Sequence, residues 1–512
     1  MNSKTWTRII ALALFAALAI PVQLAAQDNK QQSQPKHHHY QLIDMGTFGG
    51  PQSYDGGLNN HGTFAGWADT PTPDPFLASG FCFNPDCFVS HAFQWQNEVT
   101  TDLGVLPHGW SSASTSMSAS GLVSGFSQNG KVDPLFPGFP EARAVLWAHG
   151  KIVNLGTLDG GHESAALAVN SQGQVVGGFL NTTPDSNAMT LVDAESFPPI
   201  PYQARAFLWD EQKGMRDLGT LPGGADAQAT SINEAGQVAG VSYTSSAPSP
   251  ACANQTYNAL LLTTGSFLWD EENGMVDLGS LGGTCTLAIG LNKRGQVVGK
   301  SFLPGDQSEH AFLWDRKTGL IDLGTLGGDY ASAAAINDNG DAVGGSFLPG
   351  DVQYDAALWK NGAVTDLGTV NQDPCADAFA INGREQIVGA SWDCISPSGR
   401  GFLWEDGGPM VDLNTLVSSG SGLYVAEAHT INDGGEIAGI GQLPNGQIHA
   451  VLLIPCDEHH PGVEGCDYSL VDATTATAPS AARPYAPREP QRLPQSRWTN
   501  RYHIPGLQSP GK

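Results

Sequence analysis

The sequence predicts an all-β fold, an eight-bladed β-propeller built from four-stranded antiparallel blades. Three signatures recur in order along the chain, the first seven times and the other two eight times, as expected for a repeat architecture. The composition, with 14% charged residues, 63 Gly and 33 Pro among 512 residues, disfavours helical bundles and fits short strands joined by tight turns. The two ends of the repeat region are complementary, which predicts that their strands pair and close one blade.

The first signature is an apolar run that ends in Trp. In Ala311 to Trp314 successive positions are apolar, which predicts a strand buried on both faces. The short length, the aromatic content and the flanking Gly and Asn favour a strand over a helix. The run ends at Trp95, Trp147, Trp209, Trp269, Trp314, Trp359 and Trp404. We expect these indoles to belong to the core rather than to a sugar-stacking platform.

The second signature is Asp-Leu-Gly or a close variant. It begins at Asp44, Asp102, Asn154, Asp217, Asp277, Asp322, Asp366 and Asp412. A ring of these carboxylates could hold cations near a central channel. However, Asn154 keeps a hydrogen-bonding oxygen and loses the charge, which favours side chains that cap local turns.

The third signature is an Asn-led turn followed by a closing Gly. The turn at residues 337–340 has Asn first and Gly fourth, which is typical of a type I turn. It lacks the acidic ligand spacing of a calcium loop. The closing glycines are Gly66, Gly125, Gly177, Gly240, Gly299, Gly344, Gly389 and Gly439. A glycine repeated there indicates a bulge or a close backbone approach.

These signatures predict four strands per repeat: the Trp strand, the Asp-Leu-Gly strand, a small-residue strand such as Ala331 to Ile336, and a returning strand. The repeat region begins at Tyr40 with no Trp strand before it, and it ends in a Trp-type strand, His449 to Leu453. Three strands at one end plus one at the other would complete the eighth blade and leave no free sheet edge. An open solenoid would instead need polar capping repeats.

The N-terminus resembles a signal peptide, with Lys4 and Arg8 before the apolar run Ile9 to Ile20. That run is short for a membrane span. The predicted organisation is a signal peptide at 1–26, a flexible polar lead-in at 27–39, the propeller at 40–454, a Cys-containing closing segment at 455–471 and a disordered Pro/Arg-containing tail at 472–512. We therefore expect a secreted, extracellular or periplasmic protein without membrane insertion.

The net charge of −26 argues against nucleic acid and against anionic membranes as partners. Export permits disulfides, and the cysteines fall along the chain as neighbours. The expected pairs are Cys82 with Cys87, Cys252 with Cys285, Cys375 with Cys394, and Cys456 with Cys466. Zinc bound by Cys456, His459, His460 and Cys466 is the alternative to the last pair, although a disulfide suits an exported protein better. We predict no metal and no cofactor.

His-Ala-Phe at His310 and His91, together with Asp-Leu-Gly-Thr-Leu and Ile-Asn-Asp-x-Gly, resembles the bacterial extracellular repeats called the HAF family. The resemblance covers Tyr40 to Ile454. It implies an exported repeat protein and supplies no catalytic residues. The His position is taken by Arg143, Arg205, Ser266, Asp355 and Gly401 in other repeats, which argues against a catalytic role for the motif.

The connections after the closing Gly are longest in the first four repeats, and loops on a rigid scaffold often carry recognition. The candidate binding residues are aromatic and lie in or near loops: Trp67, Phe76, Phe81, Trp110, Phe136 and Trp392. No nucleophile elbow, zinc-hydrolase motif or phosphate loop is found in the sequence. The leading hypothesis is a monomeric, non-catalytic binding or scaffold module for an extracellular polysaccharide, wall polymer or protein. The alternative is an exported glycan-active hydrolase or lyase that uses scattered loop residues.

Overall fold

The computed structural model describes residues 36–77, 82–84, 86–138, 140–189, 201–253, 262–394, 399–417 and 422–472. All of them belong to the larger of the two units into which internal contacts divide the chain, Pro35–Lys512. The predicted signal peptide, most of the lead-in, Phe81 and the tail after Asp472 lie outside the described ranges.

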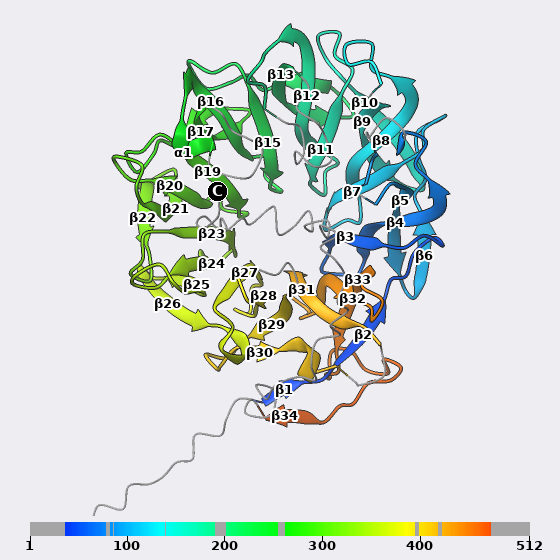
Figure 1. Cartoon of the computed structure of the whole chain (residues 1–512), viewed down its shortest axis with the longest axis vertical. Helices are drawn as coiled ribbons and strands as arrows, with labels where there is room; N and C mark the ends of the chain where they lie inside the picture. Colours follow the sequence, from blue (N-terminus) through cyan, green and yellow to red (C-terminus); the bar gives the residue numbers. More distant parts are fainter. Residues whose placement is uncertain are drawn as a thin grey trace, which may run out of the picture. The chain divides into compact units, whose positions relative to one another are not determined.

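The predicted all-β propeller is confirmed, because the strands form eight four-stranded antiparallel blades (Figure 1). Blades 6 and 7 are linked in addition by one parallel bridge between Tyr354 and Cys375. The described helices are short: α1 (Pro250–Ala253) and the 3-10 turns η2 (Val370–Gln372) and η3 (Leu413–Thr415). No helix in the described ranges has the length and apolar character needed to cross a bilayer.

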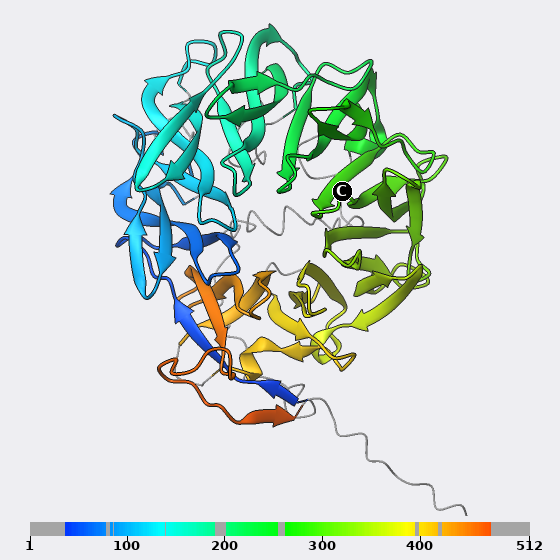
Figure 2. The same cartoon turned by 180° about the vertical axis from the view of Figure 1, so that it is seen from behind.

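Within each blade the strands follow the chain in antiparallel order, and the small-residue strand comes first. Figures 1 and 2 show these first strands nearest the central axis of the blades, where neighbouring ones contact each other. The first strands are β3 (Ser53–Leu58), β7 (Ser112–Met117), β11 (Ser164–Val169), β15 (Ala227–Ile232), β19 (Thr286–Leu291), β23 (Ala331–Ile336), β27 (Cys375–Ile381) and β31 (Tyr424–Ile431). The returning strands come second: β4 (Phe64–Pro73), β8 (Val123–Val132), β12 (Val175–Pro184), β16 (Val238–Pro248), β20 (Val297–Phe302), β24 (Ala342–Phe347), β28 (Ile387–Trp392) and β32 (Ile437–Gln442).

The Trp strand is third and the Asp-Leu-Gly strand is fourth and outermost. The third strands are β5 (Phe88–Gln96), β9 (Pro140–Ala148), β13 (Tyr202–Asp210), β17 (Leu262–Asp270), β21 (Glu309–Asp315), β25 (Tyr354–Lys360), β29 (Arg400–Trp404) and β33 (Ile448–Pro455). The fourth strands are β6 (Val99–Asp102), β10 (Lys151–Gly156), β14 (Gly214–Asp217), β18 (Gly274–Asp277), β22 (Gly319–Gly324), β26 (Ala363–Gly368), β30 (Val411–Asp412) and β2 (Tyr40–Asp44). The chain therefore crosses to the next blade after the Asp-Leu-Gly strand.

Blade 8 joins the two ends of the repeat region. Its strands β31, β32 and β33 come from the C-terminal end, and β2 comes from the N-terminal end. Tyr40 lies opposite Pro455 and Asp44 opposite Val451, so the predicted pairing of terminal strands is present. Contacts of β3 with β32 and β33 place blade 1 directly beside blade 8.

The predicted flexible lead-in differs from the structure at its C-terminal end. Strand β1 (Lys36–His38) pairs with β34 (Leu470–Asp472), so these residues are ordered by the closing segment. His37 is completely buried, and its Nδ1 lies 2.8 Å from Glu405 Oε1. The polar sequence alone does not reveal this partner, which is separated from His37 by more than 360 residues.

The Trp strands and the closing glycines behave as predicted. Trp95, Trp147, Trp314, Trp359 and Trp404 are buried, and Trp209 and Trp269 are half-buried against the blade cores. A Cβ added at Gly177 would lie 2.0 Å from the carbonyl oxygen of Ala165 on the first strand. The register shifts between Ala166 and Ala168, directly opposite this glycine. The repeated glycine thus reflects both a close backbone approach and a bulge.

The Asn-led turn also links neighbouring blades. In blade 3 the Oδ1 of Asn170 accepts hydrogen bonds from Gln172 N and Gln174 N, as a turn residue should. Its Nδ2 donates to the carbonyl of Asn233 in the next blade at 3.1 Å. The same donation recurs from Asn59 to Ser118, Asn233 to Asn292, Asn292 to Asn337, Asn337 to Asn382, Asn382 to Asn432 and Asn432 to Asn59. The last bond connects blade 8 to blade 1.

Replacing Asn292 with Ala is expected to lower the free energy of unfolding by about 1–3 kcal/mol, because buried backbone groups lose their partners. Asn292 caps its own turn through Arg294 N and Gln296 N and also donates to Asn337 O. Denaturant unfolding of the purified protein measures the loss. Ser118→Ala is the matched control, since within the described part of the chain the Ser118 side chain bonds only inside its own turn, to Ser120 Oγ and Leu122 N. Equal losses for the two variants would contradict a linking role.

Candidate functional site

The loops between second and third strands share one side of the propeller. In blades 1 to 4 their described parts bury a continuous apolar cluster together with first-strand residues. Its members include Tyr54, Trp67, Phe83, Phe126, Met189 and Tyr243. Trp67 is only 2% exposed and stacks on Tyr54 with ring centroids 5.2 Å apart. This candidate residue therefore holds the base of the loops rather than an open surface.

We call the connection of blade 1 between β4 and β5, residues 74–87, the blade 1 loop; its described residues are 74–77, 82–84, 86 and 87. A disulfide joins Cys82 to Cys87. Asp74 accepts hydrogen bonds from Phe76 N at 2.8 Å and from Phe83 N at 3.0 Å. The N–H of Asp74 in turn donates to Cys87 O at 2.8 Å. Such local bonds fix the loop on its blade.

A pair of hydrogen-bonded carboxyl groups, Asp69 and Asp86, lies at the base of the blade 1 loop. Asp69 is completely buried and accepts from Gln52 N at 2.9 Å and Asn84 Nδ2 at 3.3 Å. Asp86 is half-buried and accepts from Gln52 Nε2 at 3.1 Å. Burial, and then the neighbouring Asp86, raise the pKa of Asp69 far above that of an ordinary aspartic acid. Protonation of Asp69 is therefore favoured near neutral pH.

Trp110 is the most exposed of the described candidate aromatic residues, with 46% of its surface accessible. Its loop is nevertheless tightly held, since Leu106 N donates to Ser127 Oγ at 3.0 Å and Ser111 N to Gln128 Oε1 at 3.2 Å. Ser111 Oγ accepts from Ser90 N, and Ser90 Oγ accepts from Asn84 of the blade 1 loop. Two hydrogen bonds thus connect the Trp110 loop to the blade 1 loop.

The remaining candidates divide between two regions. Phe76 is half-buried within the blade 1 loop, and Phe136 is half-buried against the apolar cluster. Trp392 is half-buried in blade 7, where it packs against Phe347, Tyr354 and Cys375. The structure therefore gathers Trp67, Phe76, Trp110 and Phe136 on blades 1 and 2, and it places Trp392 elsewhere.

The Asp-Leu-Gly carboxylates cap turns, as the sequence predicts. Asp322 Oδ1 accepts from the N–H two residues later, on Gly324, at 2.7 Å. The same bond occurs at Asp44, Asp102, Asn154, Asp217, Asp277, Asp366 and Asp412. A cation ring is therefore not needed to explain the repeated acid.

The His of the HAF motif pairs with the Asp of the following Asp-Leu-Gly element. His91 Nδ1 lies 2.9 Å from Asp102, and His310 and His449 make the same contact with Asp322 and Asp44. Arg205 replaces His in blade 3 and keeps the ion pair, with its nitrogen 2.9 Å from Asp217. The motif thus fastens the third strand to the fourth. The sequence carried the signal for this role, since basic residues at the His position precede an Asp in these repeats.

A buried charged triad, missed by the sequence reasoning, lies between blades 8 and 1. His429 Nδ1 is 3.0 Å from Asp55 on β3, and its Nε2 is 2.8 Å from Glu427 on β31. All three side chains are at most 4% exposed. Burial alone lowers the pKa of His429, but Asp55 and Glu427 outweigh it and raise the pKa to about 10. The imidazolium therefore bridges two carboxylates across the blade junction.

Three of the four expected cysteine pairs are disulfides: Cys82–Cys87, Cys375–Cys394 and Cys456–Cys466. Cys252 and Cys285 are buried neighbouring thiols that hydrogen-bond to each other, so a covalent bond between them stays a prediction. Disulfides are consistent with an oxidising location.

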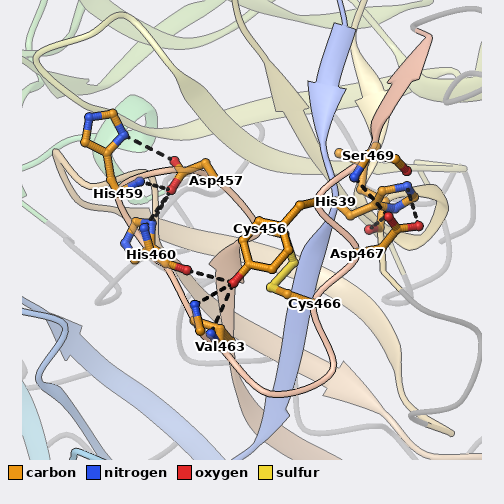
Figure 3. The surroundings of a disulfide bond; sticks show 12 residues. His39, Cys456, Asp457, His459, His460, Val463, Cys466, Asp467 and Ser469 are labelled. Carbon is orange, nitrogen blue, oxygen red and sulfur yellow. Dashed lines mark hydrogen bonds and ion pairs between the residues drawn. A yellow bond between two sulfur atoms is a disulfide. The ribbon is translucent and has the colours of Figure 1, made fainter.

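The bond between Cys456 and Cys466 removes the zinc alternative, because both sulfurs are consumed. Figure 3 shows this disulfide with His460 turned toward Asp457, whose Oδ1 lies 2.7 Å from its Nδ1. Across the described part of the chain, no three His, Cys, Asp or Glu side chains are grouped as metal ligands.

Several solved structures resemble this chain at low sequence identity. No protein-family model and no curated protein matches the sequence. The β-propeller domain of the Trilobed protease from Pyrococcus furiosus is 10% identical with a TM-score of 0.38, covering 70% of this chain and 98% of its own. Virginiamycin B lyase from Staphylococcus aureus is 12% identical with a TM-score of 0.36, covering 66% and 93%. Dipeptidyl peptidase 4 from Porphyromonas gingivalis is 9% identical with a TM-score of 0.41, covering 75% of this chain and 57% of its own.

Proposed function

We propose that the protein is an exported, non-catalytic binding module of the HAF-repeat type whose ligand is a neutral polysaccharide. The observation that carries the proposal is the exposed Trp110, held on a hydrogen-bonded loop beside the anchored blade 1 loop. Rigid presentation of an aromatic ring lowers the entropy lost when a ligand is bound.

The residues around Trp110 supply the two kinds of contact that a sugar needs. The indole offers an apolar face for the C–H side of a sugar ring, with the half-buried Phe76 on the neighbouring loop. Asp86 and Gln52 offer oxygens and an amide at the base of that loop for hydroxyl groups. The chain has 50 acidic and 24 basic residues, which favours a neutral polymer over a phosphorylated or sulfated one.

The same geometry argues against hydrolysis by the Asp69 and Asp86 pair. Glycosidases separate their two catalytic carboxyl groups by about 5 Å or more, so that a nucleophile or a water can act between them. Asp69 and Asp86 hydrogen-bond to each other directly, and Asp69 is completely buried. An exported hydrolase or lyase would have to use other residues.

Replacing Trp110 with Ala is expected to weaken polysaccharide binding by about tenfold or more, because aromatic anchors carry much of the energy at binding surfaces. The measurement is retention of the protein on insoluble glucan, xylan, cellulose and starch, with reducing ends assayed in the supernatant. Val352→Ala is the matched control, since Val352 is 82% exposed on the β24–β25 connection of blade 6. We expect it to bind like the unaltered protein.

Two results would contradict the proposal. Equal retention of the Trp110 and Val352 variants would remove Trp110 from the binding surface. New reducing ends or unsaturated products would favour the hydrolase or lyase alternative and direct the search to other loop carboxylates.

A further inference from the structure

Two buried cysteines meet where the long connection of blade 4 reaches blade 5. Cys252 lies in α1, between β16 and β17 of blade 4, and Cys285 directly precedes β19, the first strand of blade 5. The two residues are 0% and 1% exposed, and their thiols hydrogen-bond to each other. Both belong to the apolar cluster under the long connections. The two sulfurs are therefore in contact at a blade junction, inside the packed interior.

A chain of polar contacts holds α1 against blade 5. Cys252 N donates to Ser249 Oγ at 3.3 Å, and this hydroxyl lies 2.9 Å from Thr284 Oγ1. Cys252 Sγ lies 3.4 Å from Thr284 O. Thr284 is fixed in turn by Asp306 of blade 5, whose carboxylate accepts from Thr284 N at 2.8 Å and from Thr284 Oγ1 at 3.0 Å. Because Thr284 directly precedes Cys285, these bonds keep the two sulfurs side by side.

Blade 7 carries a disulfide at the position equivalent to Cys285. Cys285 and Cys375 each stand seven residues before the Asn of the turn in their blade. Each also forms a parallel bridge to the third strand of the preceding blade, Cys285 to Thr264 and Cys375 to Tyr354. Cys375 is bonded to Cys394, on the connection between β28 and β29. The start of a first strand thus accommodates a sulfur that is bonded to a connection between second and third strands.

We propose that Cys252 and Cys285 are a thiol modification site that closes to a further disulfide, and that the two thiols in the structure are its reduced form. The bond joins blade 4 to blade 5, whereas the three disulfides of the described residues each lie within one blade or within the closing segment. This inference is independent of the polysaccharide proposal, which rests on blades 1 and 2.

The length of chain between the two cysteines determines how much the bond stabilises the fold. Positions 252 and 285 are 33 residues apart, compared with 5, 19 and 10 for the three disulfides. A cross-link that closes a longer loop removes more conformational entropy from the unfolded chain. We therefore expect this bond to stabilise the propeller more than any of the other three.

The two thiols have different roles in the oxidation. The hydrogen bond from the Cys285 thiol lowers the pKa of Cys252 and outweighs burial, which raises it. The hydrogen bond to Cys252, together with burial, raises the pKa of Cys285 well above its ordinary value. The Cys252 thiolate therefore attacks one sulfur of a small external disulfide, such as oxidised glutathione, and releases one thiolate. Cys285 gives its proton to that thiolate, and its sulfur then displaces the second thiol from Cys252.

The products of this exchange balance. The two protein thiols together lose two protons and two electrons and form one S–S bond, and the external disulfide leaves as two thiols. Because both sulfurs are buried, the oxidant reaches them while the chain folds or when α1 moves away from blade 5.

Peptide mapping of the full chain tests the bond directly. The protein is purified after export into an oxidising compartment, incubated with oxidised glutathione in mild denaturant, and then unfolded with iodoacetamide and digested without reductant. We expect one pair of peptides in which Cys252 is joined to Cys285, with neither residue alkylated. Alkylation of both residues, or a bond from either of them to another cysteine, would overturn the inference.

Melting temperatures of Cys252→Ala, Cys285→Ala and the double variant separate a covalent bond from simple packing. Either single substitution breaks the same bond, so each should lower the melting temperature by several degrees and the double variant should lower it no further. The corresponding variants of Cys82 and Cys87 are the matched control, since that disulfide is present in the structure. Losses that add in the double variant would show that the two thiols only pack, and would overturn the inference.

Discussion

Replacing His429 with Leu is expected to lower the free energy of unfolding by about 3–5 kcal/mol, the typical cost of breaking a buried ion pair. The substitution keeps much of the volume and removes the positive charge between Asp55 and Glu427. Both carboxylates are at most 4% exposed, so water cannot replace the lost partner. Because the triad links β3 to β31, the loss falls on the junction between the first and last blades. Chemical denaturation monitored by tryptophan fluorescence measures it.

His310→Leu is the matched control for His429→Leu. His310 pairs with Asp322 at 2.9 Å, but Asp322 is 42% exposed and remains hydrated after the substitution. Exposed ion pairs contribute about 0–1 kcal/mol. Similar losses for the two variants would show that the charge of the buried triad does not stabilise the junction.

Acidification from pH 8 to pH 5 is expected to raise the melting temperature by several degrees. Burial raises the pKa of Asp226 to about 7, and it raises those of Asp69, Glu163 and Asp377 as well. A carboxyl group with a raised pKa stabilises the fold below its unfolded pKa, and this contribution is lost as the pH climbs through the folded value. His429, raised to about 10, stabilises fully below 6.5 and loses its contribution as the pH rises toward 10. Both kinds of group therefore favour mildly acidic conditions.

Stronger acid should reverse this trend. Burial raises the pKa of Glu405, but hydrogen bonds from His37 and Gln386 outweigh burial and lower it. Protonation of this carboxylate at low pH therefore costs stability. Thermal unfolding across the pH range locates the maximum. Asp226→Asn is the test variant, because it removes the titrating group. Its single amide oxygen can keep only one of the bonds that Asp226 accepts from Met189 N and Ala204 N, so the slope with pH is compared rather than the absolute melting temperature. A pH dependence between 5 and 8 as steep as that of the unaltered protein would contradict the role of Asp226.

The sequence predicted the region of the candidate site but not which of its residues are exposed. Loop length indicated the side of the propeller where Trp110 and the blade 1 loop lie, because insertions into a rigid repeat are accommodated in the loops between its strands. Sequence could not separate the exposed Trp110 from the buried Trp67. Each tryptophan follows a glycine beside a predicted loop. Their exposure differs because Trp67 is buried and stacks on Tyr54, whereas Trp110 is exposed. The raised pKa of Asp69 was equally hidden, since it depends on burial and on Asp86 lying beside it.

By itself, the sequence determined the blades, their number, the Trp core, the capping role of Asp-Leu-Gly and three of the cysteine pairs. These features repeat or act over short distances, so their chemistry is written in neighbouring residues. Only the tertiary structure decided the bonds between Asn turns of adjacent blades, the His429 triad and the burial of His37 against Glu405. Each of these joins residues far apart in the chain or depends on burial, and neither distance nor burial can be read from local sequence.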